Sequence, residues 1–276
     1  MQSTSFPSTP SPACGSPMAI AVDRVRALSA RYYACPDAGA AHPLVLHLHG
    51  GAFVAGLPAQ GAPVAQLLCD AGAAVLSLDY PVAPAHPFPR PLETAYAALV
   101  WVQQQRKRLA CTGSRLFVAG EEAGGNLAAA LAMVARDRGG PELAGQILLS
   151  PMLDVCVATA SQRQAGAGHV GCPWADGWRS YLAEASDAMH PYAAPANAMR
   201  LAGLPPALLI TARDDPLRDE THAYAQRLQQ AGVPAGEAVL SLATEWPLSY
   251  RDPSQADAPW ARAVRTHLRR FLEAHR

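Results

Sequence analysis

Short, fully apolar runs alternate with longer amphipathic stretches over most of this 276-residue chain. Residues 207–210, Ala-Leu-Leu-Ile, are apolar on both sides, which is typical of a parallel strand covered by helices on both faces. We expect strands at Leu44–Leu48, Ala74–Leu78, Arg115–Ala119, Gln146–Leu149, Ala207–Thr211 and Glu237–Leu242, and helices at Pro63–Ala71, Leu92–Leu109, Gly124–Arg138, Thr221–Ala231 and Asp257–His275. This alternation predicts a doubly wound, mostly parallel α/β sheet with its sites at the carboxyl ends of the strands.

The remaining segments are expected to lie around one such domain. Residues 1–17 are rich in Ser, Thr and Pro, and they lack the basic start and apolar run of a signal peptide. We expect them to form a disordered tail, and residues 18–276 to form a single domain. Residues 154–204 break the alternation, which indicates a cap inserted over the strand ends.

Charge, hydrophobicity and cysteine content limit the partners. Charged residues make up 16% of the chain and the formal net charge is +0, so no long-range field favours nucleic acid or an anionic membrane. No apolar stretch approaches the roughly 18 residues that a membrane span requires. The 6 cysteines show no metal-binding spacing. We therefore expect a soluble, cytoplasmic protein without metal or cofactor, which binds a small molecule.

A small-residue turn follows the first expected buried strand. Residues 49–53 read His-Gly-Gly-Ala-Phe. Backbone N–H groups in such a turn can point at an oxygen that develops negative charge, as in the oxyanion hole of lipases and esterases. A plain strand-to-loop connection would use the same residues. The oxyanion hole is favoured because a second motif follows in the order that this chemistry requires.

That second motif, residues 120–126, reads Gly-Glu-Glu-Ala-Gly-Gly-Asn between an expected strand and an expected helix. It matches the G-x-S-x-G elbow, in which small flanking residues allow a sharp turn that lifts the middle side chain above the sheet. The middle residue here is Glu122, where the pattern calls for a nucleophilic serine. The sequence predicts that the turn is kept and that its nucleophile is replaced.

Taken together, these and further motifs resemble the hormone-sensitive-lipase-like family of α/β hydrolases. The resemblance is carried by residues 79–89 (Asp-Tyr-Pro-Val-Ala-Pro-Ala-His-Pro-Phe-Pro), 148–154, 204–208 and 215–220 (Asp-Pro-Leu-Arg-Asp-Glu), and it spans about residues 20–275. It implies an α/β-hydrolase fold with a small helical cap and relatives of the carboxylesterase and lipase type. It also allows a homodimer.

The resemblance places site residues one by one. It implies that Gly50, Gly51 and the N–H of Ala123 form the oxyanion hole, and that Asp215 is the acid of the triad. A helix N-cap is the alternative role for Asp215. The base position falls on Glu245, where the family would show a histidine. The resemblance therefore implies that the usual Ser-His-Asp acyl transfer is not available.

A substrate pocket is expected around these residues, lined by Ala52, Trp174, Trp178 and Trp246. For the tryptophans of the cap, packing of the cap onto the body is an equally good interpretation. Trp246 also indicates that the loop carrying Glu245 is reshaped relative to the family.

If the family geometry holds, Glu122, Glu245 and Asp215 converge. Clustered carboxylates cannot all stay ionised unless they share protons or enclose an arginine or a metal. The interpretation we prefer makes Glu122 and Glu245 general base and general acid in a non-hydrolytic elimination, isomerisation or cyclisation of a small, largely apolar carbonyl compound. It is preferred because simple loss of function would more often leave Ala, Gly or Asn, and buried glutamates cost desolvation.

Two alternatives stay open. In one, the protein binds a ligand or partner without turnover, and Glu122 reaches into the oxyanion hole. This alternative gains weight if the reshaped loop turns Glu245 away from Glu122. In the other, the carboxylates hold a hard cation such as Mg²⁺ or Ca²⁺, which prefers oxygen ligands.

Overall fold

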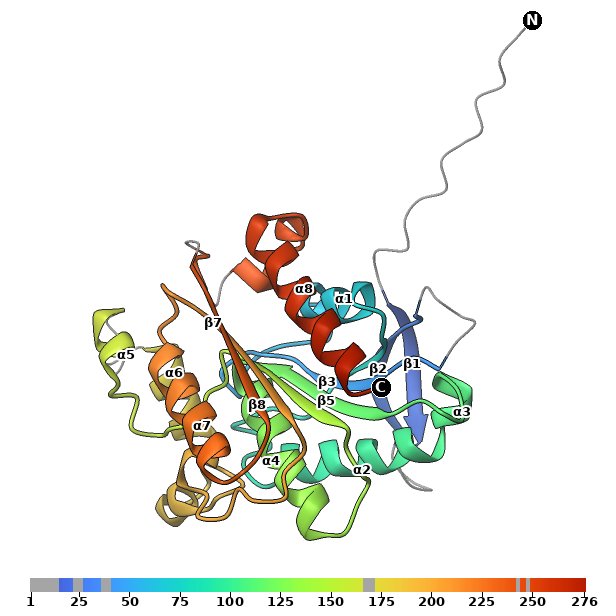
Figure 1. The fold of residues 1–276 in the computed structure, drawn as a ribbon. Helices are drawn as coiled ribbons and strands as arrows, with labels where there is room; N and C mark the ends of the chain where they lie inside the picture. The colour runs from blue at the N-terminus through green and yellow to red at the C-terminus, as the bar shows by residue number, and fades with distance from the viewer. Residues whose placement is uncertain (1–14, 22–26, 36–40, 166–171, 242–243, 247–248) are drawn as a thin grey trace, which may run out of the picture.

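A central sheet of eight strands forms the core of the molecule (Figure 1). The structure is a computed structural model, and it describes residues 15–21, 27–35, 41–165, 172–241, 244–246 and 249–276. The strands are β1 (Ser16–Ala21), β2 (Ala27–Tyr33), β3 (Leu44–Leu48), β4 (Ala74–Leu78), β5 (Leu116–Glu121), β6 (Gly145–Leu149), β7 (Ala207–Ala212) and β8 (Ala235–Leu240). Their order is β1-β2-β4-β3-β5-β6-β7-β8; the pairs β1–β2 and β2–β4 are antiparallel, and all later neighbours are parallel. The predicted fold class, a mostly parallel α/β sheet, is confirmed.

Helices cover both faces of this sheet (Figure 1). They are α1 (Ala62–Asp70), α2 (Arg90–Gln104), α3 (Arg106–Leu109), α4 (Ala123–Asp137), α5 (Ala160–Gln164), α6 (Pro173–Tyr181), α7 (Arg218–Gln230) and α8 (Pro259–Ala274), with short 3-10 turns η1 (Ala185–Met189), η2 (Pro195–Asn197), η3 (Ser249–Arg251) and η4 (Pro253–Gln255). In β3, Leu46 and Leu48 pack into the core beneath α2, α4 and α7, whereas Val45 packs into the core beneath α1 and α8. Burial on both faces explains why this strand is apolar apart from His47.

The sequence did not predict the antiparallel strands β1 and β2. Most of their residues are exposed or half-buried, and they lack the continuous apolar run that marks the parallel strands. β1 begins at Ser16, inside the segment 1–17 that was expected as a tail. Residues 1–14 of that segment lie outside the described residues.

The segment expected as a cap, residues 154–204, contains α5, α6, η1 and η2. Helix α6 packs closely against the turn after β3. A Cβ atom added to Gly177 in α6 would lie 2.2 Å from the carbonyl oxygen of Ala52. The ring of Phe53 also stacks on Tyr181 at a centroid distance of 4.0 Å. The cap therefore contacts the turn in which the oxyanion hole is expected.

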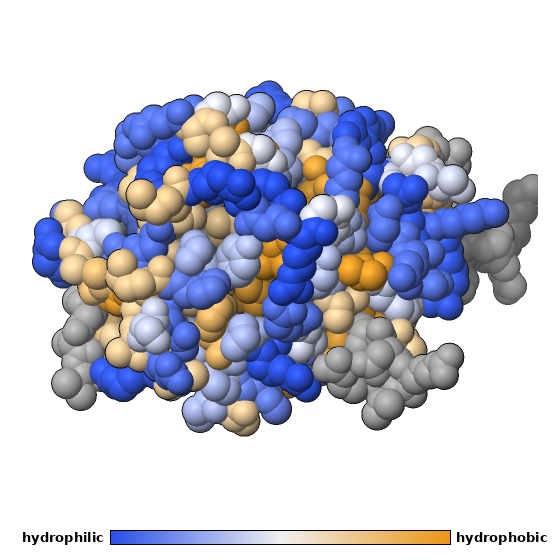
Figure 2. Space-filling model, turned by 90° about the horizontal axis from the view of Figure 1, so that it is seen from below, coloured by the Kyte–Doolittle hydropathy of each residue, from blue (hydrophilic) through white to orange (hydrophobic). Residues whose placement is uncertain are grey.

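The face seen from below in Figure 2 mixes hydrophilic and hydrophobic residues, and its hydrophobic areas are small and interrupted. Among the helices of the described residues, none combines the length and the apolar character needed to cross a membrane.

Candidate active site

The turn between β5 and α4 is a sharp elbow with a glutamate at its tip. Glu122 has φ 54° and ψ −116°, a backbone conformation that is costly for a residue with a side chain. Its backbone N–H donates to the carbonyl of Leu149 at 3.0 Å. A Cβ atom added to Gly120 would lie 2.2 Å from the carbonyl oxygen of Gly124. A Cβ atom added to Gly124 would lie 1.9 Å from the carbonyl oxygen of Leu48. The glycines are thus required by the close approach of backbone to backbone.

The turn after β3 is held by two stacked aromatic rings. His49 and Tyr80 stack at 4.3 Å, and the Tyr80 hydroxyl donates to the His49 carbonyl at 2.5 Å. The Nδ1 of His49 lies 2.9 Å from the Gly50 carbonyl oxygen and donates to it. Burial lowers the pKa of His49, which favours the neutral ring. Ala52 (φ 48°) and Phe53 (φ 65°) adopt left-handed conformations that this bracing stabilises.

A buried polar chain connects this turn to the elbow. Glu121 accepts the backbone N–H of Gly50 at 2.9 Å, and its other oxygen lies 2.7 Å from Nε2 of His47. Nδ1 of His47 lies 2.9 Å from the Ser77 hydroxyl. The N–H of Gly50, predicted to face the oxyanion hole, is thus bonded to Glu121.

The carboxylate of Glu122 lies against the turn after β3, where the oxyanion hole is expected. Its Oε2 accepts the backbone N–H groups of Gly51 at 2.7 Å and Ala52 at 3.3 Å, as well as Nη2 of Arg251. Its Oε1 accepts the indole N–H of Trp174 at 3.0 Å. The side chain of Glu122 is 2% exposed. Backbone, cap and a later loop therefore all donate to this one carboxylate.

The sequence reasoning missed Arg251. Its side chain is 36% exposed and forms the ion pair with Glu122. Burial lowers and the neighbouring Glu122 carboxylate raises the pKa of Arg251, and the net shift is upward. The only sequence signal was indirect: a buried glutamate at the elbow requires a cation or a proton, and nothing in the motif says which residue supplies the cation.

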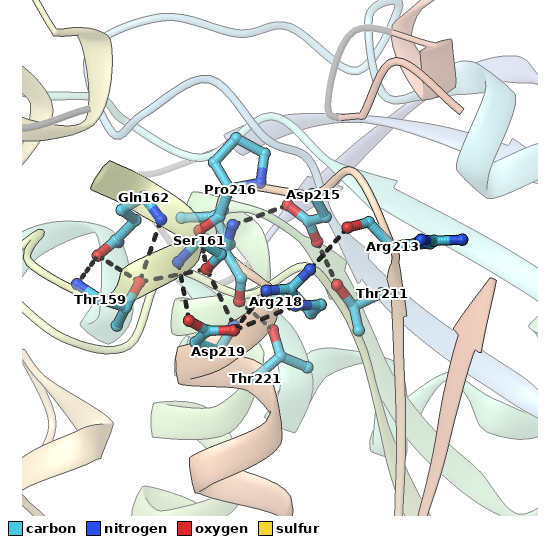
Figure 3. A network of polar contacts seen from close by, with 11 residues as sticks. Thr159, Ser161, Gln162, Thr211, Arg213, Asp215, Pro216, Arg218, Asp219 and Thr221 are labelled. Carbon is cyan, nitrogen blue, oxygen red and sulfur yellow. Dashed lines mark hydrogen bonds and ion pairs between the residues drawn. The ribbon is translucent and has the colours of Figure 1, made fainter. Parts of the chain in front are cut away.

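Asp215, expected as the acid of the triad, is buried just after β7 (Figure 3). It accepts the hydroxyls of Ser150, at 2.5 Å, and of Thr211, and the backbone N–H of Leu217 at 2.8 Å. Burial raises the pKa of Asp215, against the lowering effect of the two hydroxyls. The hydrogen bonds of the Asp215 carboxylate therefore come from β7 and from the loops that follow β6 and β7.

Glu245 is exposed, and the ion pair of Glu122 goes to Arg251 instead. The loop around Glu245 is held by Asp214, which accepts the backbone N–H groups of Thr244 at 2.7 Å and Glu245 at 2.8 Å. Residues 242–243 and 247–248, which flank this position, lie outside the described residues.

The other expected site residues differ in their placement. Ala123 is buried and is the first residue of α4. Trp178 packs against Phe53 at a centroid distance of 4.9 Å. Trp246 is buried against Tyr250 and Trp260. Of the three tryptophans, Trp174 is the one that hydrogen-bonds Glu122.

Within the part of the chain that the structure describes, no group of three or more His, Cys, Asp or Glu side chains is arranged to hold a metal ion. The cation beside Glu122 is a guanidinium group. The geometry of the described residues thus gives no support to the alternative in which several carboxylates bind a hard cation.

A strained elbow between a strand and a helix, set in a sheet of this order, is typical of the α/β-hydrolase fold. The chain belongs to the α/β hydrolase fold family, whose sequence profile matches residues 45–240. It is 38% identical over 205 residues to esterase LipI of Mycobacterium tuberculosis, which covers 72% of this chain and 63% of that protein. It is 33% identical over 195 residues to an arylesterase of Saccharolobus solfataricus, covering 69% and 63%.

Solved structures agree with these relatives. A thermostable esterase from Pseudomonas putida superposes with a TM-score of 0.79 at 30% identity, covering 94% of this chain and 82% of that one. A bacterial heroin esterase superposes with a TM-score of 0.79 at 30% identity, covering 93% and 83%. The matches to LipI and to the arylesterase each span 63% of the length of the relative, slightly less than two thirds.

These relatives contradict the functional expectations drawn from the sequence. Those expectations placed non-hydrolytic chemistry by Glu122 and Glu245 first and a protein without turnover second. The relatives are named esterases, and they point to ester hydrolysis. The expectation was wrong because it rested on the two replaced positions, Glu122 and Glu245, whereas the family similarity extends over residues 45–240.

Proposed function

We propose that this chain hydrolyses small carboxylic esters, and that Glu122, in place of a serine, acts as general base for the attacking water. One geometric observation carries the proposal. Glu122 Oε2 lies 2.7 Å from the Gly51 nitrogen and 3.3 Å from the Ala52 nitrogen. Effective oxyanion holes place their donors about 2.7–3.1 Å from the oxygen. The oxygen of Glu122 therefore stands in for the carbonyl oxygen of an ester.

An ester can enter the hole only when Oε2 leaves it. The two carboxylate oxygens have separate partners, since Oε2 binds the hole and Arg251 while Oε1 binds Trp174. In the proposed reaction the carboxylate gives up the contacts of Oε2 and lies beside the bound ester, where it can accept a proton. The retained N–H groups then stabilise the negative oxygen of the tetrahedral intermediate.

The proposed chemistry is balanced by one water molecule. The water oxygen bonds to the carbonyl carbon while Glu122 takes one of its protons. When the intermediate collapses, the bond to the alkoxy group breaks and the alcohol leaves with the proton held by Glu122. The products are an alcohol and a carboxylic acid, which ionises in water.

Attack by water leads to product at this site, whereas attack by Glu122 itself does not. Attack by the carboxylate on an alkyl ester would give an intermediate that can expel either a carboxylate or an alkoxide. The carboxylate is the far weaker base, so the intermediate would return to the starting ester. Because the chain lacks a serine nucleophile, its rate should resemble that of hydrolases from which a triad residue has been removed. Those enzymes keep about 10³–10⁴-fold acceleration over water through the oxyanion hole and binding.

Hydrolysis of p-nitrophenyl acetate tests the proposal. The wild-type chain should exceed the Glu122→Ala variant by about 100-fold, because general bases contribute about 10²–10⁴-fold. Ser150→Ala serves as a control for a different hydroxyl nucleophile and should retain activity. The proposal fails if wild type and Glu122→Ala release p-nitrophenol equally fast, or if Ser150→Ala abolishes the reaction.

A further inference from the structure

The hydrogen-bond donors around Glu122 form a complete seat for a carboxylate group. Two backbone N–H groups, from Gly51 and Ala52, and the guanidinium of Arg251 point at one oxygen, and the indole N–H of Trp174 points at the other. Charge-assisted hydrogen bonds of this kind are about twice as strong as neutral ones. The seat therefore recognises a carboxylate by charge as well as by shape.

The occupant of the seat is attached to the chain by only a short tether. Beyond its Cβ atom, the side chain of Glu122 consists of one methylene and the carboxylate, which together have the size of an acetate ion. A Glu122→Ala variant would lack these atoms while keeping the backbone at the elbow. An acetate ion can then restore the missing contacts as a free ligand.

Arg251 gives the seat its charge preference. When Oε2 leaves the hole, the ion pair between Glu122 and Arg251 is broken, because the same oxygen makes both contacts. The side chain of Arg251 is only 36% exposed, so water screens it partly. A neutral ligand would leave this cation without a partner, whereas an anionic ligand replaces the one that it loses.

Space for a short chain lies beside the seat. A cavity of about 50 Å³ is lined by Gly51, Gly56, Gln60 and Arg251 among others. This volume suits a small acyl group and is too small for a long one. The fitting ligand is thus a short-chain carboxylic acid.

We propose that the oxyanion hole, Trp174 and Arg251 form a binding site for short-chain carboxylates, in which a free carboxylate exchanges with the side chain of Glu122. The identity of this ligand as the acid product rests on the proposed ester hydrolysis, whereas the site itself does not. The tethered Glu122 competes with every free carboxylate. The apparent affinity of wild type is therefore low, because a ligand can bind only the small fraction of molecules in which Glu122 is outside the seat.

Calorimetric titration with sodium acetate at constant ionic strength tests the site. Glu122→Ala should bind acetate at least tenfold more tightly than wild type, and it should bind acetamide, the neutral analogue, far more weakly. Adding Arg251→Gln to Glu122→Ala should weaken acetate binding at least tenfold. Arg265→Gln, which removes an arginine of α8 that pairs with Asp70 of α1, is the matched control and should change nothing.

The inference is overturned if acetate and acetamide bind Glu122→Ala alike, if Arg251→Gln has no effect there, or if wild type binds acetate as tightly as Glu122→Ala. A melting curve of each variant establishes that it is folded. These measurements involve no ester. Failure of ester hydrolysis would therefore refute the proposed function while the carboxylate site is still tested.

Discussion

The two parts of this site are stabilised in different ways. The elbow at Glu122 and the turn at Gly51 are fixed by backbone contacts so close that added Cβ atoms would overlap neighbouring carbonyl oxygens. Ahead of Arg251, by contrast, the side chain of Asp214 accepts the backbone N–H groups of Thr244 and Glu245. Backbone packing therefore fixes the elbow and the turn at Gly51. Residues that contact the elbow through side chains, such as Arg251, can change without disturbing the sheet.

Adding a methyl group at Gly124 should destabilise the elbow. In Gly124→Ala the new Cβ would meet the Leu48 carbonyl oxygen at 1.9 Å, so strand or helix must shift. We expect a loss of about 3 kcal/mol in the free energy of unfolding, at the upper end for overpacking. Urea denaturation measures it. Gly113→Ala is the control, because its Cβ would meet only the Cβ of Ala41 at 3.6 Å. Equal stability of the two variants would contradict the account.

Removing the charge of Arg251 should affect the reaction more than the fold. Arg251→Gln should lower kcat for p-nitrophenyl acetate by about tenfold, somewhat less than the loss of one oxyanion-hole donor, because Arg251 is partly exposed. KM should stay unchanged or fall, since the contact of Arg251 with Glu122 opposes ester binding. Steady-state kinetics separates the two constants. An increase in KM at constant kcat would show that Arg251 serves substrate binding alone.

A buried carboxyl under the cap should make stability depend on pH. Glu220 accepts the backbone N–H groups of Leu153 and Asp154 and the amide of Gln162. Burial raises its pKa from 4.5 to about 8, against the lowering effect of the two backbone N–H groups. The folded chain thus keeps a proton that the unfolded chain has already lost. Stability should fall as pH rises from about 4.5 to about 8, by up to about 1.4 kcal/mol per pH unit.

Glu220→Gln removes this titration and isolates it from all others. Denaturation of both chains at pH 5 and at pH 8 should show a smaller decline for the variant. If the two chains decline in parallel, Glu220 does not titrate in this range.

Changing the exposed carboxylate of Glu245 should matter least. Glu245→Ala should alter kcat/KM for p-nitrophenyl acetate by less than about twofold, because surface substitutions without specific contacts have small effects. A loss of tenfold or more would mean that Glu245 reaches Glu122 during the reaction.

Much of the fold could be predicted from the sequence because the parallel strands are buried on both faces. The strand expected at Leu44–Leu48 is observed with the same bounds. The strands β1 and β2 could not be recognised, since one side of each is exposed and their pattern is mixed. Local patterns therefore predict the strands that helices cover on both faces, and they predict the strands at the edge of the sheet less well.

The site was predictable to the extent that it depends on backbone turns. The elbow at Glu122 and the hole at Gly51 follow from small residues after buried strands. The role of Arg251 depends on a loop 129 residues later in the chain, and no local pattern links the two. The family similarity corrected the functional expectation because it covers the strands that position the site, and not only the residue at the tip of the elbow.

Comparison of wild type with Glu122→Gln tests the central claim, that an ionised Glu122 activates water for ester hydrolysis. Glutamine has the shape of glutamate and can still accept the N–H groups of the hole, but it cannot take a proton from water. The account predicts that kcat/KM for p-nitrophenyl acetate falls by about 100-fold in this variant. A variant that keeps the wild-type value within about twofold would contradict it.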